Sequence, residues 1–188
     1  MLLENEKTGF LIEDYLTVGA VHEVLFRIKK DGIKKIFISS PGGSGRIVFL
    51  GLDRLIPENV TMIGGEMVCS AALSFFLCGK RRVALEETIF NFHEAIAHVD
   101  GRNVLEGELQ GLVEIRKING ENQSAIELSD LLRDLRCVNE LTINILRNAT
   151  TLSPERIHAL MRGSGMTMSA RQALRYGLIH EIIEVTKA

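Results

Sequence analysis

The chain has 188 residues, of which 46% are hydrophobic and 24% are charged, and its formal net charge is −2. This composition is ordinary for a soluble globular protein, and the length favours a single domain over residues 1–188. A net charge this close to zero gives no general attraction to nucleic acid or to an anionic membrane. The sequence therefore argues against a nucleic-acid-binding or membrane-embedded protein.

The three cysteines, Cys69, Cys78 and Cys137, have neither metal-ligand spacing nor a disulfide-framework pattern. We therefore expect no metal and a reducing compartment. The first residues are too few and too acidic for a signal peptide, and no apolar run approaches the ~20 residues that a membrane span needs. Together these features predict a cytoplasmic protein.

Strand-like and helix-like segments alternate through the first half of the chain. The expected elements are a strand at Phe10–Ile12, a helix at Val18–Lys30 capped by Thr17, a strand at Ile33–Ser39, a helix at Ile47–Ile56 and a strand at Val60–Ile63. Alternation at this spacing favours an α/β core with parallel strand pairing. Right-handed crossovers would coil such units into a spiral.

Ser70 is expected near the start of the next helix, after Gly64-Gly65 ends the strand. The first amides of a helix have no intrahelical acceptors and lie at the positive end of its dipole. A serine there can attack a carbonyl while the Ala71 amide stabilises the oxyanion. The plainer alternative is a small core serine that lets a buried helix pack closely, and this stretch alone favours that alternative.

Two further stretches shift the balance towards chemistry. Ser40-Pro41-Gly42-Gly43-Ser44 directly follows the second strand, and its glycine amides are free to face an oxygen or a peptide backbone. Downstream, Thr88 to Phe92 alternates as a strand and ends at His93. Histidine is the commonest general base for a serine nucleophile because it titrates near neutrality.

In this order and spacing, the residues resemble the proteolytic subunit of the Clp protease family, which has the ClpP/crotonase-like fold. The resemblance runs from about Lys34 to His93 and returns at Met168–Ile182. It implies an α/β spiral of ββα units with a protruding helical handle. It also implies a serine-type peptidase that cleaves unfolded or short polypeptides without a cofactor.

The same resemblance implies the roles of individual residues. Ser70 would be the nucleophile and His93 the general base, with the Gly43 and Ala71 amides as the oxyanion hole and Gly42 holding the substrate backbone. The subunits would form homo-oligomeric rings, stacked in pairs in many such proteins. Whether an ATPase unfoldase feeds the ring stays open at this point.

The segment of about 95–150 is longer than the resemblance implies and should contain an insertion plus the handle. Its first part, Ala95 to Gln123, is interrupted by glycines, and we expect part of it to be helix or hairpin. Ser124 to Glu127 matches a capping box, which predicts a long amphipathic helix to about Arg147. Helices opened by Ser153 and by Ser169, and a last strand at Leu178–Val185, complete the expected elements.

The acid of the expected triad is missing. The family's acid lies four residues before a Ser-Ala pair that opens a helix, and the corresponding position before Ser169-Ala170 is Gly165. That acid normally holds the histidine tautomer and stabilises the imidazolium. Several groups are candidates to orient His93 instead: a backbone carbonyl, Ser164, or the carboxylate of Glu66, Glu94 or Asp100.

Three alternatives follow from the sequence. Cys69 could be the nucleophile, although adjacent helical residues point about 100° apart and only one can face the base. A non-catalytic ring subunit would explain Gly165. A crotonase-type acyl-CoA enzyme would share the fold, but it needs no serine at position 70.

Overall fold

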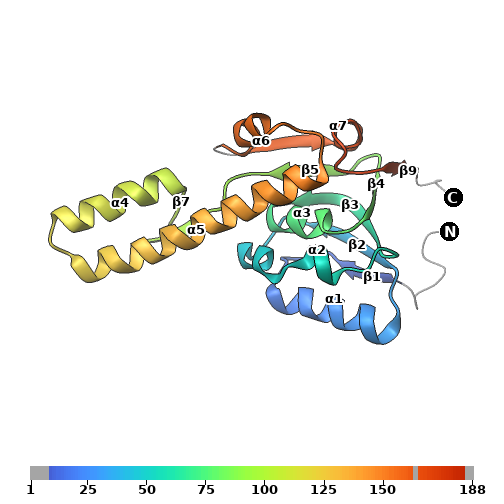
Figure 1. Ribbon diagram of the computed structural model, residues 1–188, viewed down its shortest axis with the longest axis horizontal. Helices are drawn as coiled ribbons and strands as arrows, with labels where there is room; N and C mark the ends of the chain where they lie inside the picture. Colours follow the sequence, from blue (N-terminus) through green and yellow to red (C-terminus); the bar gives the residue numbers. More distant parts are fainter. Residues whose placement is uncertain (1–8, 163–164, 185–188) are drawn as a thin grey trace.

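The computed structural model describes residues 9–162 and 165–184, apart from the side chain of Asp53. In these ranges, a mixed α/β body carries a pair of helices that projects well beyond it (Figure 1). None of the helices in the described ranges is both long enough and apolar enough to span a bilayer.

Most strands belong to one sheet, which has seven strands in the described residues. They are β1 (Gly9–Ile12), β2 (Lys35–Ser40), β3 (Thr61–Cys69), β4 (Arg81–Leu85), β5 (Ile89–Phe92), β8 (Met166–Ser169) and β9 (Glu181–Ile183). Two short strands, β6 (Ala97–Val99) and β7 (Arg102–Val104), form a separate antiparallel hairpin. The parallel α/β core expected from the sequence is confirmed, whereas β4 and β8 were not anticipated.

Strand β3 is the centre of the sheet and changes partners along its length. Its first half pairs in parallel with β2 and β4, and Met67–Cys69 pair in parallel with β5. Strands β1 and β9 extend the parallel pairing, while β8 runs antiparallel to β5. The carboxyl ends of β2, β3 and β5 therefore lie on the same side of the sheet, where α/β proteins commonly bind ligands.

The glycine pair does not end β3, contrary to the sequence prediction. A Cβ on Gly65 would lie 2.9 Å from the Ser39 Cβ, and one on Gly64 would lie 3.2 Å from the Thr88 Cγ2. These glycines let neighbouring chain segments approach the strand closely, so the strand continues through them. As a result, the following helix begins at Ser70 itself.

The helices alternate with the strands through the body and then extend out of it. They are α1 (Val18–Asp31), a 3-10 helix η1 (Gly45–Leu50), α2 (Leu52–Leu55), α3 (Ser70–Leu77), α4 (Glu106–Ile118), α5 (Asn122–Ala149), α6 (Pro154–Met161) and α7 (Ala170–Arg175). The predicted caps are confirmed: Thr17, Ser153 and Ser169 each accept a backbone hydrogen bond at the start of α1, α6 and α7.

Three sequence predictions about element boundaries are wrong. The helix expected at Ile47–Ile56 is split by Gly51, whose φ of 59° is left-handed, into η1 and α2. Helix α5 begins at Asn122, so Ser124 lies inside its first turn and forms no capping box. The last strand is only Glu181–Ile183, and Val185 lies outside the described residues.

Helix α3 lies at the centre of the hydrophobic core. Every residue from Ala71 to Leu77 is buried. Phe75 and Phe76 are fully buried, and the Phe76 ring packs against Phe90 of β5 with centroids 5.6 Å apart. A close-packed aromatic core of this kind fixes α3, and therefore its N-terminus, relative to β5.

The β6–β7 hairpin, α4 and the first half of α5 (residues 97–135) form the handle, which extends from the body in Figure 1. It has a hydrophobic core of its own: Ala97, Val99, Val104, Leu109, Val113, Leu132 and Leu135. The apolar stripe of α5 is thus largely covered by α4 and the hairpin of the same chain. The expectation that part of the 95–123 segment is helix or hairpin is confirmed, and both are present.

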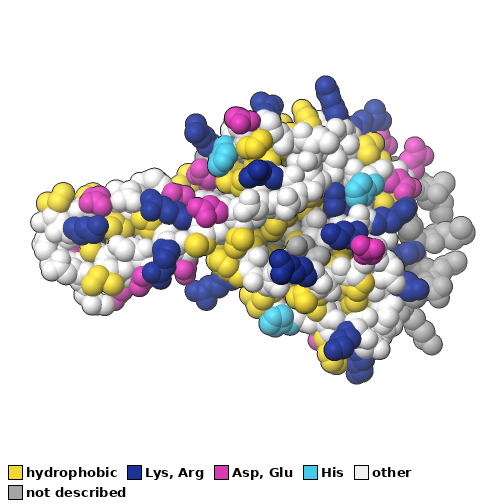
Figure 2. Space-filling model, viewed as in Figure 1, with side chains coloured by type: hydrophobic (Ala, Val, Ile, Leu, Met, Phe, Trp, Pro, Cys, Tyr) yellow, Lys and Arg dark blue, Asp and Glu magenta, His cyan; other side chains and the backbone are white. Residues whose placement is uncertain are grey.

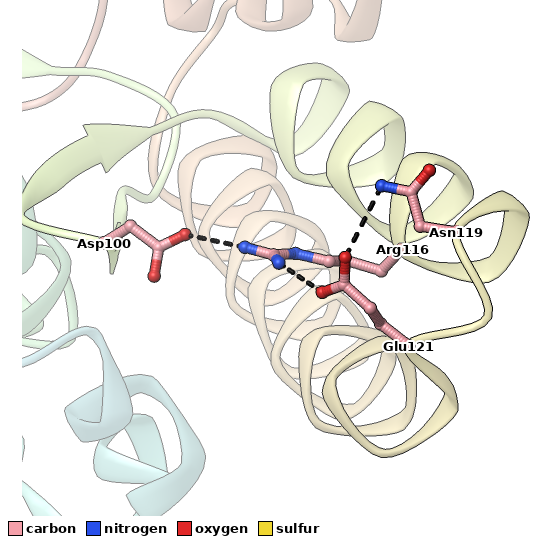
Figure 3. A network of polar contacts seen from close by, with 4 residues as sticks. All are labelled: Asp100, Arg116, Asn119 and Glu121. Carbon is pink, nitrogen blue, oxygen red and sulfur yellow. Dashed lines mark hydrogen bonds and ion pairs between the residues drawn. The ribbon is translucent and has the colours of Figure 1, made fainter.

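A charged network ties the handle together at its outer end (Figure 3). Arg116 of α4 pairs with Glu121 in the α4–α5 connection and, at 3.2 Å, with Asp100 in the turn of the β6–β7 hairpin. Hydrogen bonding to Arg116 lowers the pKa of the Glu121 carboxyl. One guanidinium therefore links two turns that are distant in sequence.

Candidate active site

Ser70 occupies the junction of β3 and α3 in a strained backbone conformation. Its φ of 53° is in the left-handed region, which few non-glycine residues adopt. Strain of this kind persists where the surrounding structure over-determines it, often at functional sites. The sharp turn places the Ser70 side chain at the positive end of the α3 dipole.

The Gly42-Gly43 segment after β2 lies directly over Ser70. A Cβ on Gly42 would lie 2.6 Å from the Ser70 Cβ, and one on Gly43 would lie 2.0 Å from the Leu16 carbonyl oxygen. The Leu16 N–H donates to Gly42 O (2.7 Å) and the Ser44 N–H donates to Leu16 O (2.9 Å), which pins the segment in place. Only glycines fit at these two positions.

Two backbone amides at this junction have no acceptor. Among the described residues, the Gly43 N–H donates no hydrogen bond, and the Ala71 N–H belongs to the first turn of α3, where no intrahelical acceptor exists. Gly43 and Ala71 line the same pocket. Free amides of residues that line one pocket can bind an anionic oxygen.

His93 follows β5 and has a fixed tautomer. Its Nδ1 lies 2.6 Å from the backbone oxygen of Glu94. A carbonyl oxygen can only accept, so Nδ1 carries the proton and, in the neutral ring, Nε2 keeps a free lone pair. The ring is therefore prepared to act as a base through Nε2.

Ser70 and His93 share one pocket of about 300 Å³ with Gly43 and Ala71. The handle supplies part of its wall through His98 and Asn103 of the hairpin, and α5 contributes Val138 and Thr142. Among the described residues, no hydrogen bond joins Ser70 to His93. Catalytic hydrogen bonds in unliganded enzymes are often long and tighten when substrate binds.

Gly165 stands where the triad acid was expected, and its backbone lies against His93. With φ at 77°, a Cβ on Gly165 would lie 2.0 Å from the Phe92 oxygen and 2.6 Å from the His93 Cβ. The position has no room for a side chain in this conformation. The acceptor for His93 comes instead from the Glu94 backbone.

Among the described residues, none of the carboxylates expected to orient His93 does so. The Asp100 carboxylate pairs with Arg116 in the handle. Glu66 is exposed on β3, and Glu94 contributes its backbone oxygen, as the sequence left open, and not its carboxylate. Ser164 lies outside the described residues.

Cys69 is a poor nucleophile in this setting. The side chain is half-buried, and burial raises the pKa of the Cys69 thiol above its ordinary value. A raised pKa leaves less of the reactive thiolate at neutral pH. Among the described residues, no three His, Cys, Asp or Glu side chains gather closely enough to hold a metal ion.

Sequence reasoning missed Asn139, a buried amide next to the site. Its Oδ1 accepts a hydrogen bond of 2.7 Å from the Ala95 N–H, just after His93. The available signal was a polar residue four positions after Leu135 in the apolar stripe of α5, a position where an aliphatic side chain is ordinary. A buried polar group in a stripe usually has a specific partner.

The comparisons with known proteins concern the fold and the C-terminal part of the chain. A family model described as Clp protease matches residues 113–186. Among solved structures, a mutant of ClpP1 from Listeria monocytogenes matches with a TM-score of 0.66 and 20% sequence identity, over 99% of this chain and 98% of that one. No curated protein sequence matches the chain.

The structural match shows that the chain has the ClpP/crotonase-like fold, as the sequence predicted. Together, the fold and the family-model match support the Clp protease family for this chain. The model match covers the handle and the C-terminal segment, whereas the Ser-Pro-Gly-Gly, Ser70 and His93 signals lie before it. The family-model match and the sequence signals of the candidate site therefore concern different parts of the chain.

Proposed function

We propose that the chain is a serine peptidase of the Clp class that cleaves unfolded or short polypeptides inside an oligomeric ring in the cytoplasm. The observation that carries this proposal is the pocket shared by Ser70 and His93, with Nδ1 of His93 bonded to Glu94 O. In this arrangement, Nε2 removes the Ser70 proton as Oγ attacks the scissile carbonyl. The proton then passes from Nε2 to the leaving amine.

The glycine segment and the start of α3 complete the proposed mechanism. Gly43 and Ala71 line the pocket, and their amides would hold the oxyanion of the tetrahedral intermediate. Gly42 lies against Ser70 and would hold the substrate backbone beside it. A ring would confine this site to chains that can thread inside.

A carbonyl in place of the acid should make the enzyme slow but not inactive. Replacing the aspartate of a triad by asparagine costs about 10⁴ in kcat, largely because the histidine takes the wrong tautomer. Here the Glu94 oxygen keeps Nδ1 protonated, so the tautomer is correct. What is missing is the negative charge that stabilises the imidazolium, so the loss should be smaller than about 10⁴.

Hydrolysis of fluorogenic peptides tests the proposal. We expect measurable cleavage by the wild-type chain and none by Ser70→Ala, which removes one hydroxyl from a fold that keeps its melting temperature. Cleavage that survives unchanged in Ser70→Ala would show that the nucleophile is wrong.

One competing function has an observation in its favour. Among the described residues, Ser70 and His93 are not hydrogen-bonded, and Gly165 replaces the acid, as expected for a non-catalytic ring subunit. A wild-type protein that assembles into rings but cleaves no peptide would support that reading. Turnover of acyl-CoA thioesters without peptide cleavage would instead support a crotonase-type enzyme.

A further inference from the structure

The peptide group between Glu94 and Ala95 is hydrogen-bonded at both ends. Its carbonyl oxygen accepts from Nδ1 of His93 (2.6 Å), and its N–H donates to Oδ1 of Asn139 (2.7 Å). A trans peptide is planar, and its C=O and N–H point in opposite directions. Fixing the direction of the Ala95 N–H therefore fixes the direction of the Glu94 oxygen towards His93.

Asn139 is itself held in one orientation. It lies on α5, is 7% exposed, and its Nδ2 donates to Oε2 of Glu106 (3.3 Å). The other oxygen of Glu106 accepts from Nε of Arg136 (2.9 Å). A carboxylate can only accept, so the Asn139 amide must turn its nitrogen to Glu106 and its oxygen to Ala95.

These hydrogen bonds form a chain in which every donor points towards Glu106. The order is His93 Nδ1–H, the 94–95 peptide, the Asn139 amide and the Glu106 carboxylate. Aligned hydrogen bonds polarise one another in a low-dielectric environment. The Glu106 carboxylate, which also pairs with Arg136, ends this chain as an acceptor, and the chain polarises the Glu94 oxygen that His93 uses.

We propose that Asn139 and Glu106 are positioning residues for His93, and that their relay through the 94–95 peptide takes the place of the triad acid. The catalytic meaning of the relay rests on the peptidase function proposed above. The missing carboxylate is not supplied by Asp100, Glu94 or Glu66. Glu106 of the handle supplies it indirectly, through Asn139 and the 94–95 peptide. If Asn139 had only a structural role, it would accept the Ala95 N–H hydrogen bond, and replacing it would leave the tautomer of His93 unchanged.

Three variants of the full chain separate these readings. Asn139→Ala removes the acceptor for the Ala95 N–H. The double variant Asn139→Asp with Glu106→Gln keeps both hydrogen bonds but moves the carboxylate one step closer to His93. The matched control is Asn144→Ala, the same change at an exposed asparagine of α5.

Two readouts are needed. Long-range ¹H–¹⁵N NMR of ¹⁵N-histidine-labelled protein reports the His93 tautomer without any need for catalysis. The rate at which a fluorophosphonate probe labels Ser70, measured against pH, reports the strength of the base. We expect a mixture of His93 tautomers and about a ten- to hundredfold slower labelling in Asn139→Ala, a partial loss of the about 10²–10⁴-fold that general-base catalysis contributes. The double variant should keep the Nδ1–H tautomer and label at least as fast as wild type, and Asn144→Ala should match wild type.

The outcomes distinguish the relay from the peptidase function. If Asn139→Ala keeps the wild-type tautomer and labelling rate while the wild-type protein labels on Ser70, the relay is wrong and the peptidase stands. If wild type does not label but the His93 tautomer changes in Asn139→Ala, the relay stands and the peptidase fails. Should Asn139→Ala not fold, slow labelling or a shifted tautomer in the folded double variant would overturn the relay.

Discussion

The backbone of Gly165 packs against His93 so closely that a Cβ on Gly165 would lie 2.6 Å from the His93 Cβ. From the sequence alone, Gly165→Asp would restore the triad acid and raise the rate, provided that the backbone there tolerates a side chain. The structure corrects that expectation, because the same Cβ would also lie 2.0 Å from the Phe92 oxygen, and φ is 77°. An aspartate there must move the backbone that carries His93.

Gly165→Asp should therefore destabilise the protein and slow peptide hydrolysis. Backbone strain of this kind costs about 1–3 kcal/mol, and the clash adds to it. Gly165→Ala is the matched control, because it introduces the same Cβ without the carboxylate. Thermal melting and peptide hydrolysis of both variants measure the effect; a Gly165→Asp protein as stable as wild type and faster would contradict the geometry.

The backbone conformation that positions Ser70 as the nucleophile should lower the stability of the protein. Its left-handed φ of 53° is costly for serine or alanine and ordinary for glycine. We expect Ser70→Gly to be more stable than Ser70→Ala by about 1 kcal/mol, although both lack the nucleophile. Differential scanning calorimetry of the two inactive variants measures the free-energy cost of the left-handed backbone conformation at position 70. Equal melting temperatures would mean that the serine conformation is not strained.

The exposed end of the handle should contribute to assembly. Ile118 is 83% exposed, and Ile115 and Ile126 are also exposed there; Figure 2 shows hydrophobic side chains at this end of the molecule. If handles meet in the proposed rings, Ile118→Asp should lower the mass of the particle in analytical ultracentrifugation while the fold stays intact. A particle of unchanged mass would show that this surface is not part of the assembly.

Leu135 and Val138 lie in the apolar stripe of α5 but are unsuitable for that test. Leu135 is 5% exposed inside the handle core. Val138 packs against the body, 3.1 Å from where a Cβ on Gly45 would lie. A charge at Leu135 should cost several kcal/mol and unfold the handle of an isolated subunit, because it would be buried without a partner.

Acid should destabilise the contact between Arg82 and His180. The Arg82 backbone N–H donates to Nδ1 of His180 at 3.1 Å, which requires that nitrogen to be unprotonated. Partial burial, followed by the charges of Arg82 and Arg81, lowers the pKa of His180 below its ordinary value of 6.5. The unfolded chain therefore takes up this proton first, so the stabilisation is full above pH 6.5 and declines as the pH falls below it. The melting temperature of wild type should fall more between pH 8 and pH 5 than that of His180→Gln; parallel curves would contradict this assignment.

Local sequence signals predicted much of the fold because each acts over a few residues. Thr17, Ser153 and Ser169 mark helix starts by side-chain caps, and those predictions are confirmed. The prediction that Gly64 and Gly65 end a strand is wrong because these glycines pack closely against Ser39 and Thr88, which are distant in sequence. Contacts between segments that are distant in sequence produce no periodic pattern, so they could not be predicted from the sequence.

The same distinction between local signals and long-range contacts applies to the residues of the candidate site. The Ser70 and His93 positions could be predicted because each follows a strand in a recognisable order. The Glu94 oxygen could not be singled out, since any backbone carbonyl was eligible. Asn139 lies 46 residues after His93, and its role depends on how α5 returns across the body.

Covalent labelling of Ser70 by a fluorophosphonate, located by peptide mass mapping, tests the central claim most directly. The pocket geometry predicts one adduct per subunit on Ser70, no adduct in Ser70→Ala, and strongly slowed labelling in His93→Ala because the base is gone. Wild-type protein that is folded and assembled but gains no adduct at Ser70 would contradict the assignment of this chain as a serine peptidase.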